Sequence, residues 1–295
     1  MLAQGSGAAL LIIMAAIAVF LVLRAIPALN ADTTNFLTTL KWSPDDTPSS
    51  FGIAALAFGS VLTSLLALVM SVPVAVGAAL AMSHYAPRWL RRPLAYMVDL
   101  LAAVPSVVFG LWGFIYLVPN IAAPSGFLSH YLGFIPFFAS NGTYGKSIFA
   151  ASVVLAVMAI PIISAISREV FIRTPRDQIE AAWAIGATKW EMVRTAVLPY
   201  GRSGIISGTV LGFGRVIGET IAVALVLSAN YRISIHILEP GGNTIAANIA
   251  NRYGDAGGVG RGALIASGLV LFVITLIVNF GARAIVSRSV RAGAS

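Results

Sequence analysis

The chain has 295 residues, of which 58% are hydrophobic and 10% are charged, and its mean hydropathy is +0.89. Soluble globular domains carry about 25% charged residues, so this composition excludes a soluble domain and indicates an integral membrane protein. With no cysteine and three scattered histidines, the chain offers no disulfide and no evident metal site, and its net charge of +8 is better explained by membrane topology than by nucleic-acid binding.

Six apolar stretches are long enough to cross a bilayer, which requires roughly 20 residues in a helix. They predict an all-α integral membrane protein with one transmembrane domain, residues 1–295, and six transmembrane helices at about 8–29, 54–82, 94–118, 147–167, 205–228 and 262–286. A cleaved signal peptide is an alternative for the first stretch. Because that stretch lacks a basic N-terminal region and a clear cleavage site, we expect an anchor. The missing basic residues leave open whether the native protein starts further upstream.

The distribution of lysine and arginine between the loops predicts the orientation of these spans. One set of segments carries twelve basic residues: Arg88, Arg91, Arg92, Arg168, Arg173, Arg176, Lys189, Arg194, Arg202, Arg283, Arg288 and Arg291. The other set carries five: Lys41, Lys146, Arg232, Arg252 and Arg261. Since basic residues concentrate on the cytoplasmic side, we expect both termini and the loop that contains Glu180 to be cytoplasmic.

Three loops on the opposite side, residues 30–53, 119–146 and 229–261, are rich in proline, glycine and asparagine. Loops of this length are often functional, and here they are suited to receive a substrate-delivering protein, although a solvated connector is an equal alternative. Residues 140–147, SNGTYGKS, end like a phosphate-binding loop but begin with serine in place of the required glycine, and no strand precedes them. We therefore expect no nucleotide site in this chain, and an energy source in a partner.

The second and third spans contain glycine and proline within apolar sequence, namely Pro73, Gly77, Pro105, Gly110 and Gly113. Such residues let membrane helices bend or approach one another closely. Asp99 lies near the cytoplasmic start of the third span, where we expect a structural role.

The most polar segment is the loop at about residues 168–204, and it predicts two short helices. Thr174 is suited to cap a helix that begins at Pro175, and Gly186 to break that helix. Thr188 and Glu191 then have the spacing of a capping box for the second helix. Pro199 is expected to end that second helix before the next span.

The fifth span carries a stripe of special residues: Gly208, Gly212, Arg215 and Glu219. Their spacing of four, three and four places them on one face of a helix. Because an arginine or glutamate at this depth is costly unless it faces a polar path or a partner, the stripe predicts one or the other along this face of the helix. The alternative is an ion pair between Arg215 and Glu219 that serves only to hold the helices together.

Several segments resemble one known family. Glu180, Ala181, Ala182, Gly186, Leu198 and Pro199 match the cytoplasmic docking loop of membrane subunits of bacterial ABC importers. The segments AAVPSVVFGLWG at 102–113 and LGFGRVIGET at 211–220 closely resemble those of phosphate importers. The run KWSP at 41–44, followed by Phe51 and Gly52, resembles the C-type (PstC-like) membrane subunit.

This resemblance implies the type I ABC importer permease fold, with cytoplasmic coupling helices, in a bacterial plasma membrane. The expected function is that of a channel-forming subunit for inorganic phosphate, not an enzyme. The expected partners are a second permease subunit (PstA-like), two copies of an ATPase (PstB-like) that bind ATP and Mg²⁺, and an external phosphate-binding protein (PstS-like). In the family the matching arginine and glutamate take part in substrate passage. A sulfate- or molybdate-type permease and a non-transport structural membrane protein are the alternatives.

Overall fold

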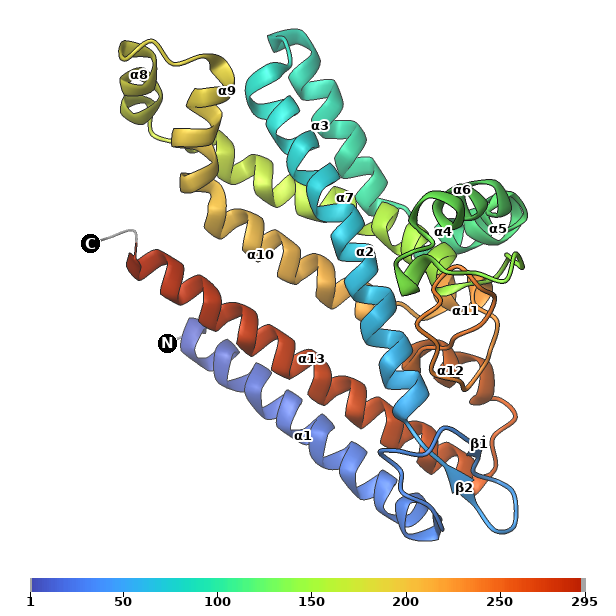
Figure 1. The fold of residues 1–295 in the computed structure, drawn as a ribbon. Coiled ribbons are helices and arrows are strands. Elements are labelled where there is room, and N and C mark those ends of the chain that lie inside the picture. Colours follow the sequence, from blue (N-terminus) through green and yellow to red (C-terminus); the bar gives the residue numbers. More distant parts are fainter. Residues whose placement is uncertain (1, 293–295) are drawn as a thin grey trace.

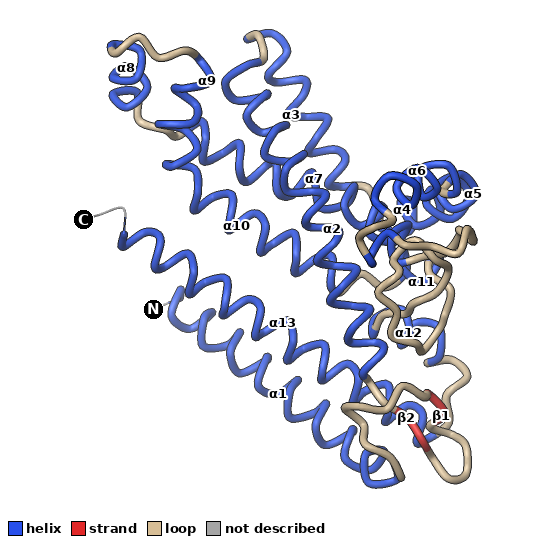
Figure 2. The backbone as a smooth tube through the Cα atoms, in the orientation of Figure 1, coloured by secondary structure: helices blue, strands red, loops and turns tan. Residues whose placement is uncertain are grey.

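The structure, a computed structural model, describes residues 2–292, and most of these residues are helical (Figure 1). The only strands in this range, β1 (Trp42–Ser43) and β2 (Ser50–Phe51), are two residues long each and pair antiparallel. Figure 2 shows most of the loop residues gathered at one end of the molecule. The prediction of an all-α protein is confirmed.

Four of the six predicted spans are long apolar helices in the described part of the chain. They are α1 (Leu2–Ala31), α2 (Ala54–Leu80) with its continuation in the π-helical turn η1 (Ala81–Tyr85), α7 (Ile148–Ile172) and α13 (Gly258–Ala292). Their apolar stretches of 24 to 32 residues are sufficient to cross a bilayer.

The predicted third span, residues 94–118, is not one straight helix. It divides into α3 (Arg88–Ala103) and a second arm at Ser106–Asn120, which meet at an angle of 90°. Val104 between them is extended, with φ −63° and ψ 129°, because the ring of Pro105 disfavours a helical conformation of the preceding residue. The second arm consists of α4 (Ser106–Trp112), the π-helical turn η2 (Gly113–Leu117) and α5 (Val118–Asn120).

The predicted fifth span, residues 205–228, is also broken. α10 (Leu198–Ile217) ends at Gly218, and the short α11 (Ile221–Val226) follows after two further residues. The chain therefore does not form six uninterrupted spans. The pattern of apolar residues located the membrane segments, but it did not reveal these two breaks.

The centre of the molecule is α7, which packs against both α2 and α10. Its buried residues Leu155, Met158 and Ile163 belong to the largest hydrophobic cluster, which also includes residues of α2 and α11. α1 contacts α13 and forms a separate pair with it, visible along the lower left of Figure 1. α13 is its main helical neighbour, and most of the apolar side chains described on α1 are exposed, as expected for a lipid-facing helix.

The helices alternate in direction and so gather the connecting segments at two ends. One end holds the start of α1, the end of α13 and the short helices α8 and α9 (Figure 1). The other end holds the small sheet together with α6 (Ala122–Leu132), the 3-10 turn η3 (Pro136–Phe138) and α12 (Ile245–Arg252). The stretch predicted to dock a partner therefore lies at the opposite end from the three long loops.

Candidate functional site

The polar loop forms the two short helices that the sequence predicts, α8 (Arg176–Ala184) and α9 (Lys189–Met192). The predicted cap by Thr174 is wrong. Its hydroxyl donates a hydrogen bond of 2.9 Å to the carbonyl of Phe171 at the end of α7, and Pro175 occupies the N-cap position of α8 without a side-chain bond. Thr174 therefore closes the preceding helix.

Gly186 separates the two helices, as predicted. Its φ is +81°, in the left-handed region that glycine enters without steric cost. Its N–H donates to the carbonyl of Trp183 over 2.9 Å, and the N–H of Ala187 donates to that of Ala182 over 3.1 Å. Both bonds satisfy carbonyls at the end of α8, so the break is a regular helix ending.

Thr188 and Glu191 form the predicted capping box at the start of α9. The N–H of Glu191 donates to the Thr188 hydroxyl over 3.3 Å, and the N–H of Thr188 donates to the Glu191 carboxylate over 2.7 Å. The Thr188 hydroxyl also donates a hydrogen bond to this carboxylate. The backbone N–H and the hydroxyl both favour the charged carboxylate, so they lower the pKa of Glu191. The start of α9 is thereby fixed at neutral pH.

The prediction that Pro199 ends the second helix is wrong. Helical structure continues from Lys189 through the π-helical turn η4 (Val193–Val197) into α10, where Pro199 lies in the first turn. The wider π-helical turn directly before Pro199 accommodates a residue that has no N–H to donate. α9 is consequently the first part of a continuous helix that runs into the membrane segment from the loop at residues 168–204, called the docking loop below after its predicted role.

The docking loop is fixed to the rest of the molecule on its inner side. Met192, Val193 and Val197 form a buried cluster with Phe171 of α7 and with Ala79 and Leu80 of α2, and Ala182 of α8 joins it. This packing places α8 and α9 in direct contact with the membrane helices α2 and α7.

On its outer side the same loop exposes large apolar residues. The side chains of Trp183, Ile185 and Trp190 are 54%, 85% and 56% exposed. Glu180 and Ala181, from the motif of the sequence analysis, are exposed on α8, while Ala182 is buried in the inner cluster. Exposed aromatic and aliphatic side chains on a polar loop indicate a protein-binding surface.

The glycines of the fifth span pack against α7. A Cβ atom on Gly212 would lie 2.9 Å from the side chain of Ile163, and one on Gly208 would lie 3.3 Å from the carbonyl oxygen of the same residue. Gly201 and Gly204 face Phe171 and Val170 in the same way. These glycines therefore allow α10 to lie directly against α7.

Arg215 lies in the last turn of α10 and is half-buried. Among the described residues its Nε is buried without a hydrogen-bond partner. The anticipated ion pair with Glu219 is not formed, because α10 ends at Gly218 and Glu219 does not continue the helical stripe. The Glu219 carboxylate instead accepts a hydrogen bond of 3.3 Å from the N–H of Ala222 at the start of α11.

The glycines of the second arm hold α11 in place. A Cβ atom on Gly110 would lie 2.7 Å from the Cα of Ala222, and one on Gly113 would lie 2.9 Å from the side chain of Val226. The arm α4–α5 thus packs closely on the segment that carries Glu219. Sequence analysis singled out these glycines, but their partner became evident only from the structure.

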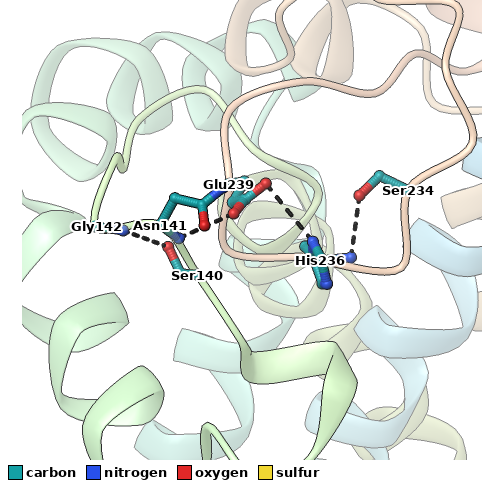
Figure 3. A network of polar contacts seen from close by, with 6 residues as sticks. All are labelled: Ser140, Asn141, Gly142, Ser234, His236 and Glu239. Carbon is teal, nitrogen blue, oxygen red and sulfur yellow. Dashed lines mark hydrogen bonds and ion pairs between the residues drawn. The ribbon is translucent and has the colours of Figure 1, made fainter.

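A polar network that the sequence did not predict joins two of the long loops (Figure 3). The Glu239 carboxylate accepts a hydrogen bond of 3.0 Å from the N–H of Asn141 and lies 3.7 Å from Nδ1 of His236. Asn141 and Glu239 are 98 positions apart, so no local motif could have revealed the contact. The network therefore links the loop at residues 119–146 to the loop at residues 229–261.

Comparison with known proteins identifies the family. Residues 71–291 match the family described as "Binding-protein-dependent transport system inner membrane component". The chain is 46% identical to "Phosphate transport system permease protein PstC 2" of Mycobacterium tuberculosis over 96% of this chain and 89% of that protein. It is 40% identical to "Phosphate transport system permease protein PstC" of Xylella fastidiosa over 88% of this chain and 81% of that protein.

Solved structures share the fold at lower sequence identity. A bacterial ABC transporter involved in the import of the acidic polysaccharide alginate matches with a TM-score of 0.57 and 16% identity, over 79% of this chain and 78% of that one. An inward-facing MetNI methionine ABC transporter matches with a TM-score of 0.53 and 17% identity, over 78% of this chain and 91% of that one. Both agree with the predicted importer permease fold. The chain belongs to the family of binding-protein-dependent transport system inner membrane components, among the relatives named phosphate transport system permease protein PstC.

Proposed function

We propose that this chain is the channel-forming permease subunit of an ATP-driven, binding-protein-dependent importer of inorganic phosphate. The observation that carries this proposal is the similarity over 96% of the chain to a phosphate transport permease. The structure adds that Arg215, in the last turn of α10, is half-buried and forms no ion pair with a carboxylate among the described residues.

The docking loop is the contact with an ATPase subunit. Its exposed surface, Trp183, Ile185 and Trp190, is suited to a groove on a partner protein, and its inner face is fixed to α2 and α7. A movement of the ATPase would reach the membrane segment through the continuous helix of α9, η4 and α10. ATP and Mg²⁺ would be bound by that partner, and this chain would need no cofactor of its own.

Arg215 and Glu219 form the substrate passage, and Gly208 and Gly212 contribute by holding α10 against α7. The guanidinium group provides a forked set of donors that matches an oxyanion. Glu219, four positions further along the chain and not ion-paired with Arg215, would reduce the positive charge of the passage, so the anion is not trapped. At neutral pH phosphate retains a proton that it can donate to Glu219, whereas sulfate has none and is repelled.

The docking end faces the cytoplasm of a bacterial cell, in agreement with the excess of basic residues on that side. Both termini then lie inside, and the opposite end, with its network around Glu239, receives the external phosphate-binding protein. A second permease subunit completes the passage, since one chain provides only one wall.

Reporter fusions placed after Trp190 and after Asn141 test the orientation of the chain in the membrane. An external signal after Trp190 would contradict it.

Transport is tested with the complete importer reconstituted in proteoliposomes. We expect ATP-dependent uptake of radioactive phosphate that requires the binding protein and is not competed by sulfate or molybdate. ATP-dependent uptake of sulfate or molybdate in place of phosphate would overturn the assignment of the substrate.

A further inference from the structure

A cavity of about 890 Å³ lies at the docking end of the molecule, apart from the passage residues. It is open to solvent and lined by five elements: η1, α3, α7, α8 and α9. The residues that matter for its chemistry are His84, Arg91, Arg92, Asp99, Arg168 and Lys189. Four permanent cations thus face a space that contains one carboxylate. Trp183 of the docking surface also lines the cavity, but none of the functions assigned above uses its charged residues.

The cations of the cavity are not neutralised within the described part of the chain. The ion pairs found there are Arg173 with Glu169 and His236 with Glu239, and neither involves a residue of the cavity. Asp99 lies on α3 with Arg91 and Arg92 but within 4.0 Å of no basic nitrogen. Positive side chains that converge without counter-charges favour an anionic ligand.

Several of these side chains are held in place by neighbouring groups. Nε of Arg91 donates to the carbonyl of Ala86 over 2.9 Å, which leaves its terminal nitrogens as free donors. The Lys189 ammonium group lies 4.8 Å from the centre of the Tyr85 ring. His84 Nδ1 shares a hydrogen bond of 2.8 Å with the Ser83 hydroxyl. These three side chains thus have defined contacts without a ligand, which lowers the entropy cost of positioning them around one.

We propose that this cavity binds a phosphate group and that its occupant ties the docking loop to α3 and α7. Two sources carry this chemistry: the headgroup of an anionic lipid, and inorganic phosphate on the cytoplasmic side. The forked donors of Arg91, Arg92 and Arg168 suit phosphate oxygens in both.

The structure contains a feature that suits the lipid in particular. Tyr96, Met97 and Leu100 of α3 are 67%, 61% and 68% exposed, so an apolar surface lies beside the cavity. Acyl chains could lie along this surface while the headgroup enters between the arginines. Basic pockets between helices on the cytoplasmic side of a membrane are typical lipid headgroup sites.

The lipid is tested with the purified full-length chain in detergent, titrated with phosphatidylglycerol and followed by native mass spectrometry. We expect the apparent Kd to rise at least about tenfold in the double variant Arg91→Gln/Arg168→Gln. The matched control is Arg88→Gln/Arg202→Gln, which removes two basic groups outside the cavity lining. Zwitterionic phosphatidylcholine should bind equally to all three proteins.

Free phosphate is tested with the chain in phosphatidylcholine nanodiscs and radioactive phosphate. Both double variants are placed in an Arg215→Gln background, so that the passage does not contribute to the signal. If the cavity variant loses phosphate binding and the control variant keeps it, the occupant is inorganic phosphate. If the cavity variant loses only phosphatidylglycerol binding, the occupant is the lipid. Equal affinities in cavity and control variants for both ligands overturn the proposal.

A measurement on the unsubstituted chain covers the case in which the double variant does not fold. Photoactivatable phosphatidylglycerol, with the reactive group on the headgroup, should label peptides around Arg91 and Lys189 if the lipid occupies the cavity. Labelling only of other segments, together with no saturable phosphate binding, also overturns the proposal. Since these tests require neither the ATPase nor transport, their failure leaves the proposed function unaffected.

Discussion

Asp45 and Gly260 are joined by a hydrogen bond across 215 positions of sequence: the N–H of Gly260 donates to Oδ1 of Asp45 over 2.8 Å. The other carboxylate oxygen accepts from the N–H of Gly257 over 2.9 Å. Asp45 lies in the loop between β1 and β2, and both glycines lie at the start of α13. One carboxylate thus satisfies free donors at a helix start and attaches the small sheet to it.

Asp45→Ala should lower stability by about 1–2 kcal/mol, since charge-assisted hydrogen bonds to an exposed carboxylate are lost. This corresponds to a decrease of roughly 2–8 °C in the midpoint of thermal unfolding, measured in detergent. Asp46→Ala is the matched control, because its side chain is exposed and accepts no hydrogen bond in the described part of the chain. Equal unfolding midpoints in both variants would contradict the role of Asp45.

Gly186→Val should abolish phosphate uptake and the stimulation of ATP hydrolysis while the protein still inserts. A β-branched residue at φ +81° is strained, so the second helix of the docking loop is misplaced. Gly186→Asn should retain a large share of both activities, because asparagine tolerates the left-handed region better than other residues.

Glu180→Ala should reduce the same activities less than Gly186→Val, since Glu180 is exposed and its loss leaves the backbone unchanged. ATPase rates of the reconstituted complex, at equal amounts of assembled protein, measure both effects. Unaltered stimulation in the Gly186→Val complex would rule out this coupling role.

Gly212→Val should destabilise the protein by about 1–3 kcal/mol, because the added atoms enter the contact between α10 and Ile163 of α7. Gly214→Ala on the same helix is the control. A Cβ atom there meets nothing within 4 Å, and alanine favours a helix by about 1 kcal/mol over glycine. The thermal unfolding midpoint should therefore fall for Gly212→Val and stay or rise for Gly214→Ala; the reverse order would mean that α10 does not pack in this way.

Arg215→Gln should reduce phosphate uptake severely without loss of assembly, because the forked cationic donors disappear from the passage. Uptake by the reconstituted complex and co-purification of its subunits measure the two quantities. Intact uptake in a correctly assembled complex would show that Arg215 is dispensable.

Glu219→Gln should impair uptake less than Arg215→Gln and relax the exclusion of sulfate. The glutamine side-chain oxygen can still accept the hydrogen bond from Ala222, so the start of α11 is preserved while the charge is removed. The assay requires a binding protein that does not itself select phosphate. Continued exclusion of sulfate under that condition would assign selectivity elsewhere.

The sequence by itself determined the class of the protein and two features of its docking loop, the capping box and the glycine break. Spans such as α2 and α7 follow from long apolar runs that only a helix can carry through lipid. The capping box of Thr188 and the break at Gly186 also follow from sequence, because both depend on backbone groups within a few residues.

Only the tertiary structure decided where some helices end and which distant segments touch. A helix end depends on a choice between two local conformations, and a long-range contact depends on residues far apart in sequence. Pro199 continues a helix because a π-helical turn precedes it, and Gly218 ends the helix that was expected to join Arg215 to Glu219. The attachment of Asp45 to α13 and the convergence of Arg91, Arg168 and Lys189 on one cavity link segments far apart in sequence. The periodic pattern of apolar residues in the sequence does not predict such contacts, since they arise from the packing of helices against one another.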